Sequence, residues 1–254
     1  MQTGLAGLLI AQPSRPFHPL LIETSLIMFA DIRAVIIDLD GTMVDTAPDF
    51  LLAVNRMRED FRLSAMTLTE IKRMVGKGSE HLIRQVLAQD FDEAGVQQHF
   101  DAALAGYQHH YAQINGLHSE LYPDVLSGLQ TMQALGLKLA CVTNKPIAFA
   151  QALLQMKGLA PYFSLTYGGD SFAHKKPHPL PLLSACQQFG LPPAQVMAIG
   201  DSSNDAIAAR AAGCPVLTVP YGYNHGEPVQ NIESDGIVET LLSAAKLLTT
   251  STTT

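Results

Sequence analysis

The sequence predicts an α/β protein: a doubly wound parallel sheet with an inserted helical cap domain. Short apolar runs rich in β-branched residues recur along the chain, as in strands buried on both faces of a parallel sheet. From about residue 120 onward, stretches of helical periodicity separate these runs, which is the alternation of a doubly wound fold. Between residues 47 and 117 only helical patterns occur, so we expect the sheet domain to be interrupted by a helical one.

The first 28 residues are expected to form a poorly ordered extension. Gly4–Ala11 is apolar, but it is too short to span a bilayer and no basic residue precedes it. Three prolines within residues 13–19 disfavour a helix. We therefore expect neither a membrane span nor a cleaved signal here, and Met28 is an alternative start of the chain.

The first predicted strand lies within Arg33–Asp40 and ends on acidic residues, with Gly41 closing the run. Asp38 and Asp40 are two positions apart, so on a strand their carboxylates would point the same way and repel each other. A hard divalent cation, which prefers oxygen ligands, would offset that charge. An isolated pair of this kind is usually a turn or a helix cap, so the interpretation depends on what accompanies it.

Four helices are predicted in the insertion, and turn-forming glycines separate two of them. Thr67 and Glu70 have the spacing of a capping box, and Gly76 and Gly78 mark the following junction. The predicted helices are Pro48–Phe61, Thr67–Val75, Ser79–Gln89 and Asp92–Gln113. The sequence thus predicts a core domain of residues 29–46 and 118–254 and a cap domain of residues 47–117.

Further strands are predicted after the insertion, and polar segments follow them. The strands are Leu137–Val142, Val196–Ile199 and Val216–Val219, with a weaker one near Phe163–Gly168. In an open parallel sheet, ligands bind beyond the carboxyl ends of the strands. The polar segments to consider are therefore Thr143-Asn144-Lys145, Lys175-Lys176-Pro177 and Gly200–Asp205. The Ser/Thr-rich end, Thr249–Thr254, is expected to fray.

The side chains in these segments suit a phosphoryl group and a metal. Thr143 supplies a hydroxyl, Asn144 an amide and Lys176 a compact positive charge, all suited to phosphoryl oxygens. Asp201 and Asp205 add carboxylates at a second strand end. Each residue alone has an ordinary interpretation as a helix cap or a surface charge. Their order at successive strand ends indicates phosphate chemistry.

Composition excludes several other classes of function. The formal net charge is −7 and no run of Lys or Arg is long enough to form a basic stripe, so we expect neither nucleic acid nor an anionic membrane as a partner. Cys141, Cys186 and Cys214 are odd in number and lack metal-site spacing, which favours reduced core residues of a cytoplasmic protein. The nine histidines are scattered and receive no catalytic role. The oligomeric state, monomer or dimer, stays open.

These motifs resemble those of the haloacid dehalogenase superfamily, and the resemblance extends from about Phe29 to the C-terminal helix. The matching motifs are Asp38-Leu-Asp40-Gly-Thr42, Thr143, Lys176-Pro177 and Gly200-Asp201-x-x-x-Asp205. Within the superfamily, the chain is most similar to the bacterial phosphoglycolate phosphatases. That likeness rests on Asp40–Thr46, Tyr122–Val125, Val142–Pro146, Gly168–Asp170, Lys175–Pro179, Gly200–Asp205 and Tyr221–Asn224. Met43 and the turn Gly76–Ser79 depart from the usual pattern.

The resemblance implies a Rossmann-like core and a phosphatase that forms an aspartyl-phosphate. Asp38 would be the nucleophile, and Asp40 would protonate the leaving alcohol and then activate water. Mg²⁺ would be held by Asp38, the backbone carbonyl of Asp40 and Asp201. The supporting residues are Asp205, Gly41 and Thr42; the phosphate ligands are Thr143, Asn144 and Lys176; the candidates for contacting the organic end are Gly76, Lys77, Gly78, Arg84 and Lys145.

The implied substrate is a small phosphorylated metabolite, a phosphorylated organic acid such as 2-phosphoglycolate. The same chemistry on a phosphosugar, a sugar acid phosphate or a nucleotide monophosphate is an alternative, because the cap selects the substrate and fold alone does not. A phosphoacceptor signalling domain is a second alternative, although such domains are smaller and lack a cap. A phosphoryl transferase or mutase is a third, and it would need a cap residue that activates the acceptor.

Overall fold

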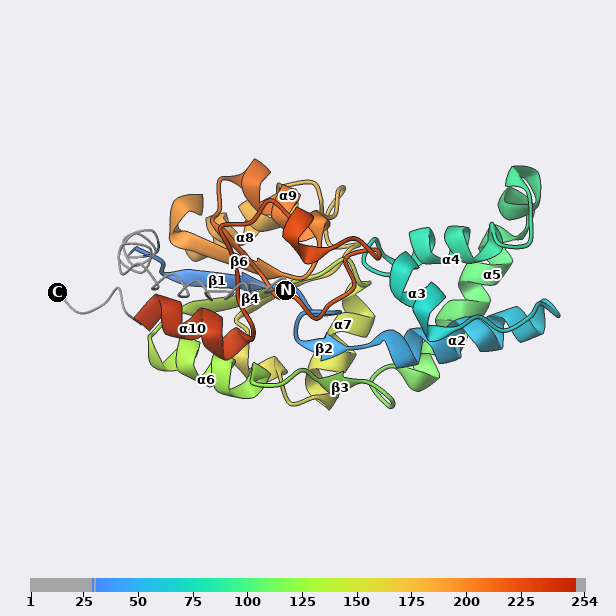
Figure 1. Ribbon diagram of the computed structural model, residues 1–254, viewed down its shortest axis with the longest axis horizontal. Coiled ribbons are helices and arrows are strands. Elements are labelled where there is room, and N and C mark those ends of the chain that lie inside the picture. Colours follow the sequence, from blue (N-terminus) through green and yellow to red (C-terminus); the bar gives the residue numbers. More distant parts are fainter. Residues whose placement is uncertain (1–28, 30, 250–254) are drawn as a thin grey trace, which may run out of the picture.

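A six-stranded parallel sheet forms the centre of the protein (Figure 1). The computed structural model describes residue 29 and residues 31–249; the predicted extension, residues 1–28, and the tail from residue 250 lie outside the described residues. The strand order is β5-β4-β1-β6-β7-β8. The strands are β1 Ala34–Ile37, β4 Lys138–Val142, β5 Leu165–Tyr167, β6 Val196–Gly200, β7 Val216–Thr218 and β8 Gly236–Ile237. The predicted doubly wound sheet is confirmed, with β8 as an additional edge strand.

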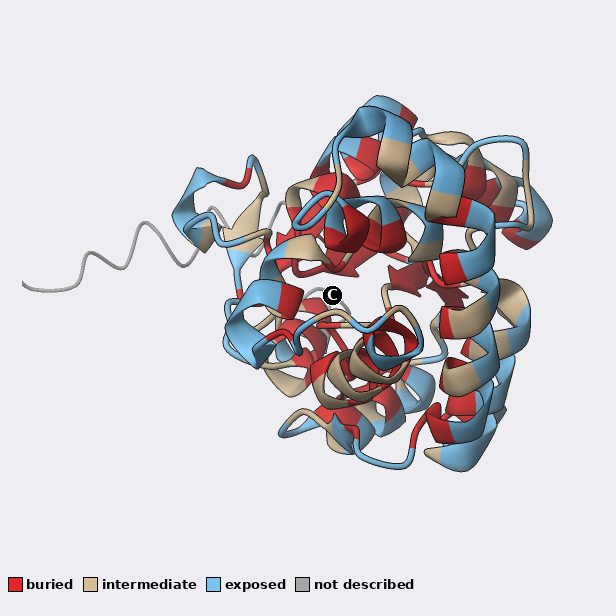
Figure 2. Ribbon diagram, turned by 90° about the vertical axis from the view of Figure 1, so that its right-hand side faces the viewer, coloured by how far each residue is buried: buried red, intermediate tan, exposed pale blue. Residues whose placement is uncertain are grey.

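Helices cover both faces of this sheet, which explains why its strands are continuously apolar. Val35 and Ile37 of β1 face one hydrophobic cluster, whereas Ala34 and Ile36 face another, because successive side chains alternate across a strand. The first face is covered by α6 Val125–Ala134, α7 Ile147–Met156 and α10 Leu241–Thr249, and the second by α8 Leu180–Phe189 and α9 Ser203–Ala212. Figure 2 shows the strands as buried between helices with exposed outer faces.

The helical insertion leaves and rejoins the sheet domain at one place. β2 Val44–Asp45 pairs antiparallel with β3 Glu120–Leu121, and the chain between them forms four helices (Figure 1). These are α2 Ala47–Asp60, α3 Leu68–Met74, α4 Ser79–Leu87 and α5 Glu93–Ile114. They bury a separate cluster that includes Met57, Ile83 and Tyr107. The predicted helices are present, and the Thr67–Glu70 capping box is formed at the start of α3.

The remaining elements are single 3₁₀ turns: η1 Ala160–Tyr162, η2 Pro193–Gln195 and η3 Val229–Asn231. Within the described part of the chain, no helix combines the length and apolar character needed to cross a bilayer. The three cysteines are free and buried, although the sulfur atoms of Cys186 and Cys214 lie only 3.8 Å apart. Residues that are distant in sequence are therefore neighbours in the core between α8 and the start of β7.

Candidate active site

Polar residues converge beyond the carboxyl ends of the central strands. Asp38 follows β1, Thr143 follows β4 and Asp201 follows β6. The three strands are parallel and in register, with Ile37 opposite both Cys141 and Ile199. Residues one position beyond them are therefore carried to the same edge of the sheet. The segments that the sequence singled out meet here.

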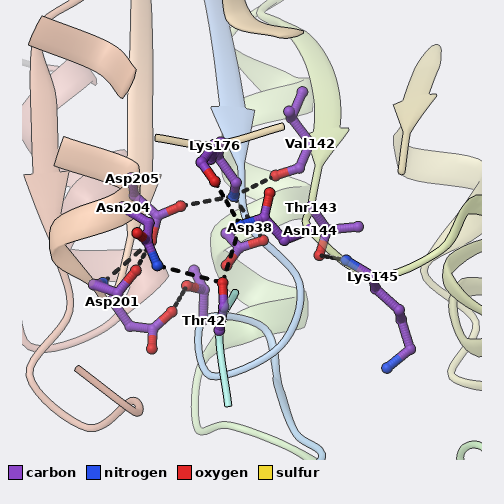
Figure 3. Close-up of polar contacts among 12 residues, drawn as sticks. Asp38, Thr42, Val142, Thr143, Asn144, Lys145, Lys176, Asp201, Asn204 and Asp205 are labelled. Atoms are coloured by element: carbon purple, nitrogen blue, oxygen red, sulfur yellow. Dashed lines mark hydrogen bonds and ion pairs between the residues drawn. The ribbon is translucent and has the colours of Figure 1, made fainter. Parts of the chain in front are cut away.

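Lys176 joins two of the carboxylates (Figure 3). Its Nζ lies 2.9 Å from Oδ1 of Asp38 and 2.6 Å from Oδ1 of Asp205, and it donates a hydrogen bond to the carbonyl of Val142 at 2.7 Å. The side chain is only 5% exposed. Burial alone would lower the pKa of Lys176, but Asp205 and Asp38 outweigh it and raise that pKa. The ammonium is therefore held charged against the nucleophile candidate.

Three carboxylates form an acidic cluster that fits a metal ion. Asp38, Asp201 and Asp205 each offer an oxygen, and these atoms lie within 4.8 Å of one another. Burial raises the pKa of Asp38 to about 6, although Lys176 opposes the shift. Burial, together with Asp205 and Asp38, raises the pKa of Asp201 well above its ordinary value. A divalent cation suits this set of oxygen donors and would offset their repulsion.

Asp201 is held in place by the turn after β1 and by the loop after β7. Its Oδ1 accepts a hydrogen bond from the hydroxyl of Thr42 at 2.8 Å, and its Oδ2 accepts one from the N–H of Tyr223 at 2.7 Å. Gly41 has φ of +86°, and a Cβ at this position would collide with the Asp201 carboxylate. Glycine is therefore required for the turn to approach the acidic cluster so closely.

Asp205 has a structural role in addition to its place in the cluster. Its Oδ2 accepts hydrogen bonds from the N–H and the hydroxyl of Ser202, at 3.1 and 2.7 Å, which forms a capping box at the start of α9. The other oxygen, Oδ1, contacts Lys176. One side chain thus fixes the helix and the ammonium relative to each other.

Asp40 has different partners from Asp38. Its Oδ1 accepts a hydrogen bond from Thr46 at 2.7 Å and forms an ion pair with Nζ of Lys145 at 2.8 Å. The side chain is 10% exposed, so it is partly accessible at the floor of the pocket. The two aspartates that follow β1 are therefore held by separate sets of partners.

Asn144 connects the sheet domain to the insertion. Its Nδ2 donates hydrogen bonds to the carbonyl of Gly76 at 3.0 Å and to the carbonyl of Lys176 at 2.9 Å. Its buried Oδ1 has no hydrogen-bond partner among the described residues. The neighbouring Thr143 hydroxyl accepts the N–H of Lys145 at 3.3 Å, so its proton remains available to a ligand.

A pocket lies above these residues and is enclosed by both parts of the protein. The core contributes Asp38, Asp40, Thr143, Asn144, Lys145 and Phe149, and the insertion contributes Phe50, Val75, Gly76, Gly78, Ser79, Leu82, Tyr107 and Tyr111. Burial raises the pKa of Tyr107 and of Tyr111, so both hydroxyls keep their protons near neutral pH. A ligand here would contact acidic, hydroxyl and aromatic groups together.

Four of the residues that the sequence suggested for contacting the organic end of the substrate lie in the insertion, and two of these four line this pocket. Gly76 and Gly78 are on its wall. Lys77 lines a neighbouring, more open hollow with His174 and His178, and Arg84 lies in the same hollow with its guanidinium 3.7 Å from the ring centroid of Phe100. The cation that does reach the pocket is Lys145.

Sequence reasoning did not identify the aromatic residues that the insertion places around the site, although Tyr223 lies in the Tyr221–Asn224 stretch that it did single out. Phe50 and Tyr111 have the spacing of ordinary helix core positions, and both belong to the core of the insertion. Tyr223 also belongs to that core, although it comes from the sheet domain. No pattern in the sequence distinguishes such residues from packing residues, because the distinction depends on how the insertion is turned toward the sheet.

Comparison with known proteins gives a consistent family assignment. Residues 32–213 match the haloacid dehalogenase-like hydrolase family. A curated protein of Thiobacillus denitrificans named phosphoglycolate phosphatase is 45% identical over 218 residues, which cover 86% of this chain and 96% of the relative. A plasmid-encoded phosphoglycolate phosphatase of Cupriavidus necator is 41% identical, covering 85% of this chain and 93% of the relative. The crystal structure of a predicted phosphoglycolate phosphatase from Haemophilus somnus superposes with a TM-score of 0.80 at 32% identity, covering 85% and 98% of the two chains.

Proposed function

The chain belongs to the haloacid dehalogenase-like hydrolase family, and from this premise we propose that it hydrolyses 2-phosphoglycolate to glycolate and phosphate with the help of Mg²⁺. The reaction class rests on one arrangement above all, the ion pair between Asp38 and Lys176 beside Asp201 and Asp205. The substrate is supported by the names of curated relatives that align over most of their own length. The earlier resemblance to this family is confirmed.

Asp38 begins the proposed reaction as a nucleophile. Its carboxylate attacks phosphorus, an aspartyl-phosphate bond forms and the bond from phosphorus to the leaving oxygen breaks. Asp40 gives its proton to that oxygen, so the product leaves as an alcohol. The two aspartates have separate partners, since Asp38 contacts Lys176 whereas Asp40 contacts Thr46 and Lys145.

Asp40 then acts in the reverse sense to release phosphate. It accepts a proton from a water molecule as the water oxygen attacks phosphorus, and the bond to Asp38 breaks. Inorganic phosphate leaves, and both aspartates return to their starting states. The partial exposure of Asp40 at the pocket floor is consistent with access for that water.

Positive charge near the phosphoryl oxygens makes the first attack feasible. Lys176 and the hydroxyl of Thr143 would contact those oxygens, and fixed donors of this kind contribute strongly to catalysis. Mg²⁺ would be held by Asp38, the carbonyl of Asp40 and Asp201, supported by Asp205, and when bound it would reduce the repulsion between carboxylate and phosphate.

The insertion has the position of a cap that closes over the substrate. Residues 47–117 supply one wall of the pocket, and the carbonyl of Gly76 is bound by Asn144 of the core. An enclosed site protects the phosphoenzyme from untimely hydrolysis and strengthens electrostatic contacts. We place the reaction in the cytoplasm, as three free, buried thiols suit a reducing compartment.

A panel of phosphate esters would test the proposal directly. The purified protein is assayed with 2-phosphoglycolate, phosphosugars, a sugar acid phosphate and nucleotide monophosphates, each with Mg²⁺ and with EDTA. We expect 2-phosphoglycolate to have the highest kcat/KM and EDTA to abolish turnover. A higher kcat/KM for a phosphosugar would disprove the substrate while leaving the reaction class intact. A single turnover without continued release of phosphate would instead indicate a phosphoacceptor domain.

A further inference from the structure

One cation in the pocket has no part in the reaction as described above. Among the described residues that line the pocket, Lys145 is the only lysine or arginine. Its side chain is 2% exposed, and its Nζ contacts Oδ1 of Asp40 at 2.8 Å and the hydroxyl of Tyr111 at 2.6 Å. The ammonium also lies 4.6 Å from the ring centroid of Phe50. Burying a lysine is costly unless it is paired, and Asp40 and Tyr111 provide that pairing within the pocket.

We propose that Lys145, assisted by Tyr111, binds the carboxylate of the substrate and so determines specificity for phosphorylated organic acids. This inference rests on the proposed function and assigns one end of the substrate to particular residues. Because phosphate binding already requires Lys176 and the acidic cluster, a second anionic group needs a second cation. Lys145 is placed to be that cation.

The arrangement around Asp38 separates the two ends of such a substrate. Figure 3 shows Asp201 and Asp205 on one side of Asp38 and Lys145 on the other, beyond Thr143 and Asn144, with its ammonium well apart from the acidic cluster. In the proposed reaction the phosphoryl group must lie next to Asp38, which attacks its phosphorus atom. The organic part of a bound ester would therefore extend toward the Lys145 side and the aromatic wall.

The hydrogen-bond capacity of the pair matches a carboxylate. An ammonium has three N–H donors, and Asp40 and Tyr111 use two of them within the described part of the chain. Tyr111 accepts from Lys145, so its own hydroxyl proton can be donated to a ligand. The remaining N–H of Lys145 and the hydroxyl proton of Tyr111 could each bind one oxygen atom of a substrate carboxylate. A neutral hydroxyl in place of that carboxylate would be a weaker partner for the buried ammonium.

The aromatic surroundings strengthen this contact. Phe50 stacks on Tyr111 with ring centroids 5.3 Å apart, and Phe149 meets Tyr111 edge-on with centroids 5.1 Å apart. The rings limit water around the ammonium, and charged hydrogen bonds are stronger where water is excluded. Lys77 and Arg84 line the open neighbouring hollow instead, so their charges are better solvated.

A pair of substrates that differ only at the distal group tests this assignment. The value of kcat/KM is measured for 2-phosphoglycolate and for 2-hydroxyethyl phosphate, in which a neutral alcohol replaces the carboxylate. We expect Lys145→Met to lower the ratio of the two values at least tenfold, since a hydrogen bond to a charged group contributes on the order of tenfold or more. Lys157→Met, at the end of α7 and outside the pocket, is the matched control and should keep the wild-type ratio.

The ratio distinguishes substrate recognition from a structural role of Lys145. If Lys145 only orients Asp40, both substrates lose activity in equal proportion and the proposal is wrong. It is also wrong if Lys77→Met, and not Lys145→Met, removes the preference. Calorimetric binding of 3-phosphonopropionate and propylphosphonate gives a second readout that needs no turnover, and thermal melting verifies that each variant is folded.

Failure of the proposed function would give a different result. If the wild-type enzyme does not prefer 2-phosphoglycolate over 2-hydroxyethyl phosphate, the proposed substrate is wrong, and so is the role proposed for Lys145. If the wild-type enzyme has that preference and Lys145→Met retains it, only the assignment of Lys145 is wrong.

Discussion

Lys176 connects catalysis and stability within one side chain. It is buried between Asp38 and Asp205, and each of these carboxylates would lose its cationic partner if the ammonium were removed. A charge left buried without a partner is destabilising, as well as being unsuitable for chemistry that depends on fixed positive charge. Substitutions at this position should therefore affect both properties.

We expect Lys176→Ala to lower kcat by about a hundredfold or more at saturating Mg²⁺, because one preorganised donor to the phosphoryl oxygens is lost. The same variant should lose about 3 kcal/mol of folding free energy, the usual cost of breaking a buried ion pair. Steady-state kinetics and urea unfolding measure the two effects. Lys157→Ala serves as the control, and a kcat within threefold of wild type for Lys176→Ala would contradict the assigned role.

The acidic cluster predicts a pH-dependent response to metal. In the metal-free protein, the pKa of Asp38 is raised to about 6 and that of Asp201 is also raised, so the folded protein holds protons that the unfolded chain releases. The stabilisation from these protonated carboxyl groups is fully present at pH values below their pKa in the unfolded chain. It is lost as the pH rises through their higher pKa in the folded protein. Metal binding replaces those protons with a cation.

We therefore expect Mg²⁺ to raise Tm more at about pH 7.5 than at about pH 5, since protons compete for the same carboxylates at the lower pH. Thermal unfolding with and without Mg²⁺ at both values provides the measurement. Asp201→Asn should show a much smaller gain from metal at the higher pH. An equal gain in Tm at both pH values would argue against the cluster as the metal site.

At the scale of the elements, strands β1, β4, β6 and β7 and the loops after them were predictable, because these strands are short apolar runs that are mostly buried. Val196–Gly200 and Lys138–Val142 agree with their predicted ranges within a residue. β8 escaped prediction because two residues, Gly236 and Ile237, are too few to form a pattern. Local hydrogen bonding was also predictable, as the capping box of α3 shows.

The contact between Lys145 of the sheet domain and Tyr111 of the insertion was not predictable from the sequence. The sequence offered Lys77, Arg84 and Lys145 as equivalent cations, and only the arrangement of α5 over the sheet distinguishes them. Tyr111 reaches Lys145 because that face of the helix is turned toward the core, and a periodic apolar pattern does not specify which partner the face meets. Long-range packing supplies this information.

The turn after β1 should be intolerant of any side chain at its glycine. We expect Gly41→Ala to weaken Mg²⁺ binding at least tenfold, because a Cβ at a φ of +86° is strained and would displace the Asp201 carboxylate. The Mg²⁺ dependence of kcat and of Tm measures the effect. Gly136→Ala is a suitable control, as this glycine also has a positive φ but no atom lies near its missing Cβ. Unchanged Mg²⁺ affinity in Gly41→Ala would contradict this account of the turn.

At the scale of the whole molecule, Tyr223 connects the metal site to the root of the insertion. Its N–H binds Asp201, and its hydroxyl donates to Asp45 and accepts the N–H of Ala47, the first residue of α2. Its ring packs in the core of the insertion. The position of the insertion and the position of a proposed metal ligand are therefore linked through one residue.

We expect Tyr223→Phe to lower the free energy of unfolding by about 1–3 kcal/mol, because the buried N–H of Ala47 and the carboxylate of Asp45 both lose a partner. It should also raise KM more than it lowers kcat, since the ring and the bond to Asp201 remain. Urea unfolding and steady-state kinetics measure these changes. Tyr162→Phe, whose partly exposed hydroxyl accepts from Gln130, is the control, and equal effects of both variants would contradict the linkage.

The pairing of β2 with β3 has a consequence for how this architecture diversifies. Because Val44 lies opposite Leu121 and Asp45 opposite Glu120, the two ends of the insertion leave the sheet side by side. Another segment whose two ends lie equally close together could therefore replace the insertion without changing the pairing of β2 with β3. Exchange of the insertion would then replace the aromatic wall of the pocket, Tyr111 included, while the acidic cluster, Lys176 and Lys145 remain on the sheet domain.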